Sequence, residues 1–339
     1  IVSDRFLLAA AKRSDRIPEA VLRGLFTCAA DIAWVFRVGG VRQLERNLTH
    51  VFASEMRRSN GSVDNRELRR RVRHCSRQGM RSYFAYFCDA MTVGARSEQQ
   101  LRARIRGTGS GFDSIVRDAR QGVSSLIAMG HQGNWDYAGY WARLEVAPVV
   151  TVAERLANDE LLHTFVDIRE RLGMRILLTG QHDLTGRLRN VLLDSTVVVP
   201  LLADRDLGRH GVFVHAFDSV IRVARGPAAL AYDTGNPLYV VNLYREKLSG
   251  RREEQAGVPY GYVCEISGPI DVHAFHDMPR QEALHAISQA WVDLWAQGIA
   301  AHPQDWHMLQ PLFWEDLDHS RLQDADEPCS RMADNSPGQ

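Results

Sequence analysis

The chain has 339 residues, of which 45% are hydrophobic and 24% are charged, and its 41 basic and 41 acidic residues give a formal net charge of zero. This composition is that of a folded globular protein and excludes a disordered chain. The zero net charge argues against a nucleic-acid-binding protein. No run approaches the ~20 apolar residues that are needed to span a bilayer.

Arginine supplies 39 of the 41 basic residues, because the only lysines are Lys12 and Lys247. Planar guanidinium groups suit phosphate binding. The five cysteines are scattered and form no Cys-x-x-Cys pair, so neither a disulfide framework nor a zinc site is predicted. The start of the sequence has no signal-peptide pattern, and we therefore expect a cytoplasmic protein.

Residues 1–105 are predicted to form a helical N-terminal region, because apolar residues recur there mostly at helical spacings. Such amphipathic helices either pack on the core or lie on anionic lipid, and we expect this region to face a membrane. A helix over residues 64–93 carries an aromatic cluster that belongs either to the core or to an acyl pocket: Tyr83, Phe84, Tyr86 and Phe87.

From about residue 123 short apolar runs alternate with helical segments. Strands are predicted at 124–129, 148–153, 174–178, 195–203, 213–215, 238–244 and 260–266, with a charged loop over 245–258. Helices are predicted at 135–144, 159–172, 182–193 and 227–234, and a long one follows. This alternation predicts an α/β core over residues 106–317, with a mostly parallel or mixed central sheet flanked by helices. The polar segment 318–339 is expected to be a disordered tail.

Two patterns argue against familiar cofactor sites. The glycines of the Gly107–Gly111 loop precede a predicted strand and lack the lysine of a P-loop, so nucleotide binding is not favoured. His273 and His276 lie close together without an evident third ligand. We expect no metal and no cofactor.

The segment His131-Gln-Gly-Asn-Trp-Asp136 directly follows the predicted strand 124–129. Ligands of open α/β sheets bind beyond the carboxyl ends of the strands. Asp136 would hold the imidazole of His131, whose free nitrogen can then take a proton from a hydroxyl. Because no serine or cysteine nucleophile lies alongside, that hydroxyl would belong to the substrate, and direct group transfer is predicted. By itself, His-x-x-x-x-Asp is a motif of low specificity.

With its inner residues Gly133, Asn134 and Trp135, the motif resembles that of the His-x-x-x-x-Asp lipid acyltransferases. These include the lauroyl and myristoyl transferases of lipid A synthesis and the phosphatidylinositol mannoside acyltransferases, to which the similarity is greater. The similar segments are 43–48, 130–139, 151–156, 169–173, 203–207, 226–231 and 305–311. The most specific of them are Thr-Val-Ala-Glu-Arg-Leu at 151–156 and Asp-Trp-His-Met-Leu-Gln-Pro at 305–311.

The resemblance implies a peripheral enzyme on the cytoplasmic face of the plasma membrane. It would transfer a long acyl chain, typically palmitoyl, from acyl-coenzyme A to the 6-hydroxyl of a mannose of phosphatidylinositol mannosides. His131 would be the general base and Asp136 its partner. Where the family has a glutamate, this chain has Asp204, which we expect to position the acceptor sugar.

Further residues are assigned to substrate binding by the same resemblance. Glu154 and Arg169 match family positions near the polar head group, and Arg155 and Arg205 can bind phosphates. Backbone N–H groups at 133–134 are candidates for the oxyanion site, and Tyr137, Tyr140 and Trp141 for an acyl channel. The alternatives are transfer to lipid A or another glycolipid, or a non-catalytic lipid-binding homologue.

Overall fold

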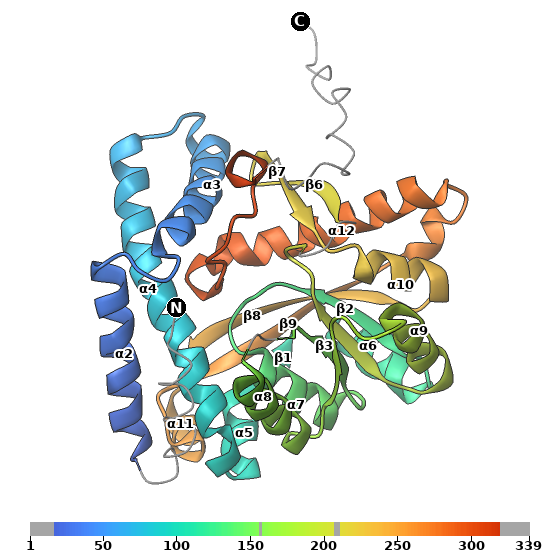
Figure 1. Ribbon diagram of the computed structural model, residues 1–339, viewed down its shortest axis with the longest axis horizontal. Coiled ribbons are helices and arrows are strands. Elements are labelled where there is room, and N and C mark those ends of the chain that lie inside the picture. Colours follow the sequence, from blue (N-terminus) through green and yellow to red (C-terminus); the bar gives the residue numbers. More distant parts are fainter. Residues whose placement is uncertain (1–16, 156–157, 207–210, 319–339) are drawn as a thin grey trace, which may run out of the picture.

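A five-stranded sheet lies at the centre of the computed structural model, which describes residues 17–155, 158–206 and 211–318 (Figure 1). Its strand order is β1-β9-β8-β2-β5. The strands are Ile105–Thr108 (β1), Ser125–Met129 (β2), Val198–Leu202 (β5), Leu238–Lys247 (β8) and Tyr260–Ile270 (β9). Only the β8–β9 pair is antiparallel. The predicted mixed and mostly parallel sheet is confirmed.

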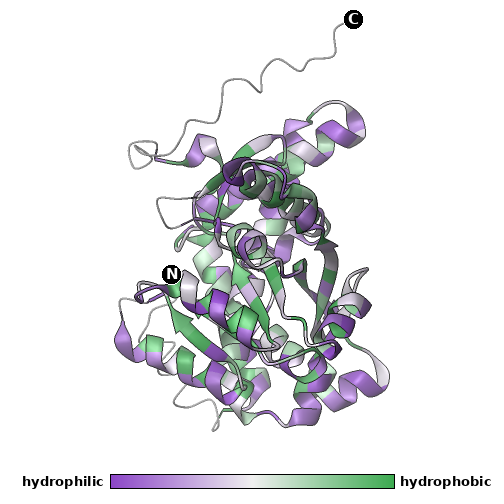
Figure 2. Cartoon of the chain, turned by 90° about the vertical axis from the view of Figure 1, so that its right-hand side faces the viewer, coloured by the Kyte–Doolittle hydropathy of each residue, from purple (hydrophilic) through white to green (hydrophobic). Residues whose placement is uncertain are grey.

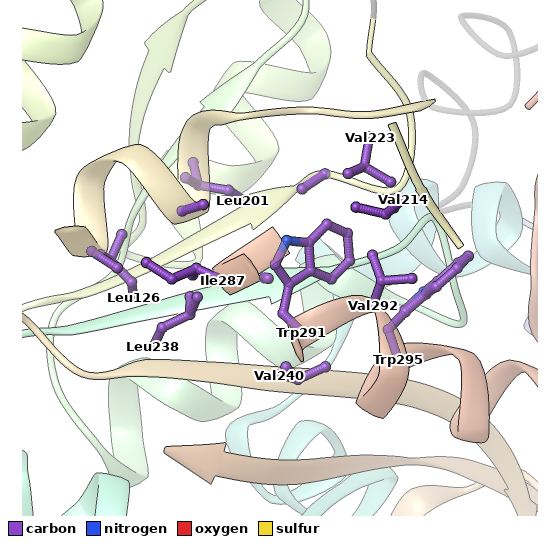
Figure 3. Packing of buried hydrophobic residues seen from close by; sticks show 14 of the residues in the cluster. Leu126, Leu201, Val214, Val223, Leu238, Val240, Ile287, Trp291, Val292 and Trp295 are labelled. Atoms are coloured by element: carbon purple, nitrogen blue, oxygen red, sulfur yellow. The ribbon is translucent and has the colours of Figure 1, made fainter. Parts of the chain in front are cut away.

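Helices cover both faces of this sheet. All five residues of β2 are buried, and successive side chains point to opposite faces. Leu126 and Ala128 pack with α10 and α12, whereas Ile127 and Met129 pack with α6 and α7. On the side of the sheet covered by α10 and α12, Trp291 of α12 lies among aliphatic side chains (Figure 3). In Figure 2, hydrophobic strands lie between helices with hydrophilic outer faces. These helices are α6 (Phe112–Arg120), α7 (Trp135–Glu145), α10 (Gly226–Thr234) and α12 (Arg280–Ala301).

Two smaller strand pairs flank the sheet. The parallel pair β3 (Val150–Ala153) and β4 (Arg175–Leu178) is bridged to β5 through Val149 and Val198. The antiparallel pair β6 (Val212–Ala216) and β7 (Ser219–Val223) lies beside α12. The remaining short elements are α5 (Glu98–Arg104), α8 (Asp159–Arg171), α9 (Leu184–Asp194), α11 (Gly250–Ala256) and the 3₁₀ turns Val93–Ala95, Val272–Phe275, Pro303–Asp305 and Trp314–Asp316.

Three long helices form the N-terminal region, as predicted: α2 (Glu19–Val35), α3 (Val41–Asn60) and α4 (Asn65–Thr92). Asp64 caps α4 by accepting hydrogen bonds from the N–H groups of the first turn. The three helices share a hydrophobic core that is separate from the two cores on the faces of the sheet. Helix α2 is the outermost of them (Figure 1), and no helix of the described ranges is both long and apolar enough to cross a membrane. The predictions for residues 1–16 and 319–339 lie outside the described residues.

Buried ion pairs hold α2 on the rest of the fold. Glu19 accepts hydrogen bonds from both terminal nitrogens of Arg104, each at 3.0 Å, and Arg23 pairs with Asp89. Arg104 is 2% exposed and Asp89 1% exposed. The pKa of Glu19 is lowered, because its hydrogen bonds to Arg104 and the charge of Arg23 together outweigh the effect of burial, which alone would raise it. The position of α2 is therefore set by charge pairing as well as by apolar packing.

Three local predictions are wrong. The segment 245–258 is not a loop, because β8 extends to Lys247 and α11 follows it. Strands β1 and β7 were not predicted, and the glycine segment 107–111 begins inside β1 and leads into α6 instead of directly preceding a strand. A Cβ atom on Gly109 would lie 2.2 Å from the carbonyl oxygen of Ile266, so this glycine allows close packing of the loop on β9.

Candidate active site

Two neighbouring parallel strands bring the catalytic candidates together. His131 follows β2 and Asp204 follows β5, and Met129 pairs with Leu202 at the ends of these strands. The ring Nδ1 of His131 lies 2.6 Å from Oδ1 of Asp204, and the main-chain N–H of His131 donates to Oδ2 at 2.9 Å. Trp306 Nε1 donates to the same Oδ2 at 3.1 Å. Asp204 therefore holds His131 by both its ring and its backbone.

The environment of Asp204 favours its ionised form. Burial alone would raise the pKa of this fully buried carboxyl, but the charge of His131 and the hydrogen bonds from His131 and Trp306 outweigh burial and lower it. An ionised carboxylate only accepts hydrogen bonds, so Nδ1 of His131 carries a proton. In the neutral form of the imidazole, Nε2 is then the nitrogen with the free lone pair, as a general base requires. The His131 side chain is 22% exposed, which leaves the ring accessible.

Asp136 lies in a separate ion pair at the start of α7. Its Oδ1 accepts from Arg169 Nε at 2.7 Å, and its Oδ2 accepts from the Tyr86 hydroxyl at 3.1 Å. Burial alone would lower the pKa of Arg169, but the charge of Asp136 outweighs it and raises the pKa. Burial, together with the charge of Asp136, raises the pKa of Tyr86 well above its usual value. This cluster joins α4, α7 and α8 beside the histidine.

The contacts of the two aspartates correct the sequence analysis. Asp136 was expected to hold the imidazole and Asp204 the acceptor sugar. The structure instead places Asp204 against His131 and Asp136 against Arg169. Asp204 is 0% exposed and does not line the cavity beside His131, so it is not positioned to contact a sugar. Ligand sites lie at the carboxyl ends of strands, and this rule could have identified Asp204 as the partner of His131, because Asp204 follows β5 as His131 follows β2.

A mostly apolar cavity of about 300 Å³ is lined by His131 and lies between the sheet and α7. The sheet contributes Ile127, Val198, Val241 and Cys264 to its walls. Other walls come from α7 and from the aromatic cluster of α4. Of the residues that were considered for an acyl pocket, those that line the cavity are Tyr83, Tyr86, Phe87 and Trp141, whereas Phe84, Tyr137 and Tyr140 are not among them.

Charged side chains also line the cavity. Among them, Glu154 and Arg205 form an ion pair of 3.1 Å between Arg205 Nη2 and Glu154 Oε2. Arg205 also contacts Gln310. Asp136 and Arg169 line the cavity as well. Arg155 does not, because its side chain is exposed outside the cavity, and its predicted role in phosphate binding stays a prediction.

Two further expectations concern oxyanion donors and metals. The N–H of Gly133 donates to the carbonyl oxygen of Asp305 at 2.9 Å, so it is not available to an oxyanion. Among the described residues, no group of three or more histidine, cysteine, aspartate or glutamate side chains could hold a metal ion. His273 packs edge-on against His276.

A histidine–carboxylate pair at the carboxyl edge of an α/β sheet, joined to a buried apolar cavity, is the arrangement of a lipid acyltransferase. The family model described as bacterial lipid A biosynthesis acyltransferase matches residues 6–315, and the chain belongs to this family. Two relatives are named phosphatidylinositol mannoside acyltransferase. That of Mycobacterium tuberculosis (strain ATCC 25618 / H37Rv) is 32% identical over 306 residues, which cover 90% of this chain and 86% of the relative. That of Mycolicibacterium smegmatis is 32% identical over 306 residues, covering 90% and 89%.

Proposed function

We propose that the protein transfers a palmitoyl or similarly long acyl chain from acyl-coenzyme A to the 6-hydroxyl of a mannose of phosphatidylinositol mannosides. The observation that carries the proposal is that His131 lines a mostly apolar cavity, because this joins a site for an acyl chain to a general base. The names of the two mycobacterial relatives support the choice of acceptor.

The proposed reaction needs one base. The acceptor hydroxyl loses its proton to Nε2 of His131 while its oxygen attacks the thioester carbonyl, and Asp204 stabilises the imidazolium that forms. The tetrahedral intermediate then collapses, the carbon–sulfur bond breaks and the coenzyme A thiolate leaves. The imidazolium returns its proton to the thiolate or to solvent. General-base catalysis of this kind contributes ~10²–10⁴-fold to the rate.

The cavity walls suit the acyl chain. Cys264 is fully buried on β9, and burial raises the pKa of its thiol to about 12, so it remains a neutral lining group. On the cavity wall, the Glu154–Arg205 pair supplies charged groups for the polar head of a donor or acceptor. In this proposal Asp136 and Arg169 hold the wall beside the acceptor.

We also propose that α2 binds the cytoplasmic face of the plasma membrane, because one side of this helix exposes apolar residues. Val21, Leu25, Ile32, Val35 and Phe36 are each more than half exposed, and Phe36 is 72% exposed. Their spacing places them on one face, opposite the buried Leu22 and Phe26. Adjacent apolar side chains on a surface helix mark a lipid or protein interface.

The first test is release of coenzyme A from palmitoyl-coenzyme A, with and without phosphatidylinositol dimannoside, followed by mass spectrometry of the lipid. Acceptor-dependent release and a product heavier by one acyl chain are expected. Acylation of lipid A or another glycolipid in a parallel assay, without acylation of the mannoside, would contradict the proposed acceptor.

His131→Ala distinguishes an enzyme from a lipid-binding homologue. An enzyme loses turnover and keeps its fold, which circular dichroism reports. If the wild-type protein binds the mannoside in vesicles but releases no coenzyme A with any acceptor, a lipid-binding protein is the better description.

A further inference from the structure

His307 lies directly opposite His131 in a short antiparallel contact between two segments of the backbone. The N–H of His307 donates to the carbonyl oxygen of His131 at 2.7 Å, and Gln132 forms a bridge with Trp306. Residues that face each other in an antiparallel pair project to the same side. Both imidazoles accordingly line the cavity.

One nitrogen of the His307 ring is satisfied by a buried chain of polar groups. Nε2 lies 3.0 Å from the hydroxyl oxygen of Ser82, which lies 2.7 Å from Oδ1 of Asp305. Burial raises the pKa of Asp305 in spite of the hydrogen bonds from Ser82 and from the N–H of Arg245, whose nitrogen lies 3.1 Å from Oδ2. The Ser82 hydroxyl donates to Oδ1 of Asp305, so its oxygen accepts from Nε2–H of His307.

The other nitrogen is left with a lone pair and no partner. The side chain of His307 is only 6% exposed. Its Nδ1 is buried and has no hydrogen-bond partner among the described residues. A buried polar atom without a partner destabilises the folded state unless a ligand or water satisfies it. Burial, with smaller contributions from the charges of His131 and Arg245, lowers the pKa of His307 to about 3, so this lone pair persists at neutral pH.

We propose that Nδ1 of His307 accepts a hydrogen bond from a second hydroxyl of the acceptor sugar, beside the hydroxyl that His131 deprotonates. The inference rests on the proposed function, since it assigns a partner within the acceptor. Two hydrogen bonds on one sugar fix its orientation, whereas one leaves it free to rotate. His307 is thus a positioning residue, and water, which has no second hydroxyl to offer, gains less from it than a sugar does.

The test compares His307→Leu and His307→Asn, with His50→Leu as a matched control, because His50 is also largely buried but lies outside the cavity. His307→Leu is expected to reduce kcat/KM for the acceptor roughly tenfold, the usual effect of losing one hydrogen bond. It should also shift the partition of acyl-coenzyme A from transfer towards hydrolysis. His307→Asn, which retains an acceptor oxygen near Nδ1, should recover most of the loss. The wild type and His307→Leu should transfer the acyl group at equal rates to an acceptor that lacks the second hydroxyl.

NMR of ¹⁵N-histidine-labelled protein supplies a readout that does not depend on turnover. The expected signal of His307, assigned by its loss in His307→Asn, is an unprotonated Nδ1 and a protonated Nε2 between about pH 5 and 9. A protonated Nδ1 overturns the inference. So does equal transfer by the wild type, His307→Leu and His50→Leu. If the wild type transfers no acyl group to any hydroxylated lipid although Nδ1 is unprotonated, the proposed function has failed, and the assigned partner of His307 fails with it.

Discussion

The carboxylate of Asp204 accepts hydrogen bonds from both the ring Nδ1 and the main-chain N–H of His131. The same side chain therefore fixes the ring tautomer and the path of the backbone at the end of β2. Any change at Asp204 must alter both, which makes it the most informative position for substitution.

Asp204→Asn should lower kcat by ~10²–10⁴-fold, because the neutral amide neither stabilises an imidazolium nor enforces the Nδ1–H tautomer. Release of coenzyme A measures the effect. Asp204→Glu, which keeps the charge, should retain far more activity. Full activity of the asparagine variant would show that the reaction does not need the charge of Asp204 beside His131.

The stability conferred by Asp204 should depend on pH in a defined direction. Its pKa is lower in the folded chain than the unfolded value of ~3.9, because its hydrogen bonds and the charge of His131 favour ionisation. This contribution is fully present above pH ~4 and is lost as the pH falls through the folded pKa. Urea unfolding of the wild type and Asp204→Asn should therefore differ most at neutral pH. A difference that grows in acid would contradict the assignment.

Asp136→Asn should destabilise the fold by about 3–5 kcal/mol, because it leaves the largely buried guanidinium of Arg169 without a counter-charge. Chemical denaturation measures this value. The double variant Asp136→Asn/Arg169→Gln removes both charges and should cost less than the sum of the single changes. Additive losses would mean that the two side chains are not coupled.

Cys264→Phe should shift the acyl-chain preference towards shorter chains. Cys264 lies on β9, two strands from β2 and so roughly 10 Å from the strand that carries His131. A larger ring there fills part of the cavity without touching the base. We expect the rate ratio of palmitoyl- to decanoyl-coenzyme A to fall more than tenfold, and Cys264→Ser, the matched control, to keep the wild-type ratio. An unchanged ratio in the phenylalanine variant would place the acyl chain elsewhere.

The double variant Leu25→Glu/Phe36→Glu should lose flotation with anionic liposomes, because Leu25 lies on the exposed face of α2 and the exposed Phe36 directly follows the end of this helix. Leu193→Glu is the control, since Leu193 is 54% exposed on α9. Point changes are preferable to deletion of residues 1–50, which would also remove the buried Leu22 and Phe26 from the core. Equal flotation of both variants would exclude α2 as the membrane contact.

The order of strands and helices in the core could largely be predicted from the sequence, because strands that are buried on both faces, such as β2 and β5, read as continuous apolar runs. Strand β1 escaped detection, since Arg106 and Gly107 interrupt its four-residue pattern and β9 supplies its stability. Strand β7 and helix α11 are similarly short.

The roles of His131, Asp136 and Asp204 in a site stay predictions, but their predicted contacts can be compared with the structure. Asp204 contacts His131 and Asp136 contacts Arg169, so the predicted partners of the two aspartates were wrong. Asp136 is near His131 in sequence, whereas Asp204 is 73 residues away and reaches it through the pairing of β2 with β5. Local spacing does not register a contact that depends on which strands are neighbours.

The ion pairs between α2 and the interior have a geometric consequence. With Glu19 held by Arg104 and Arg23 by Asp89, α2 cannot roll or slide without separating buried charges. A bilayer that rests on the exposed face of α2 would lie at a constant height above His131. Only hydroxyl groups at a matching distance from the lipid tails could then reach the base. The fixed position of α2 would thus select which hydroxyl group of the lipid head group is acylated.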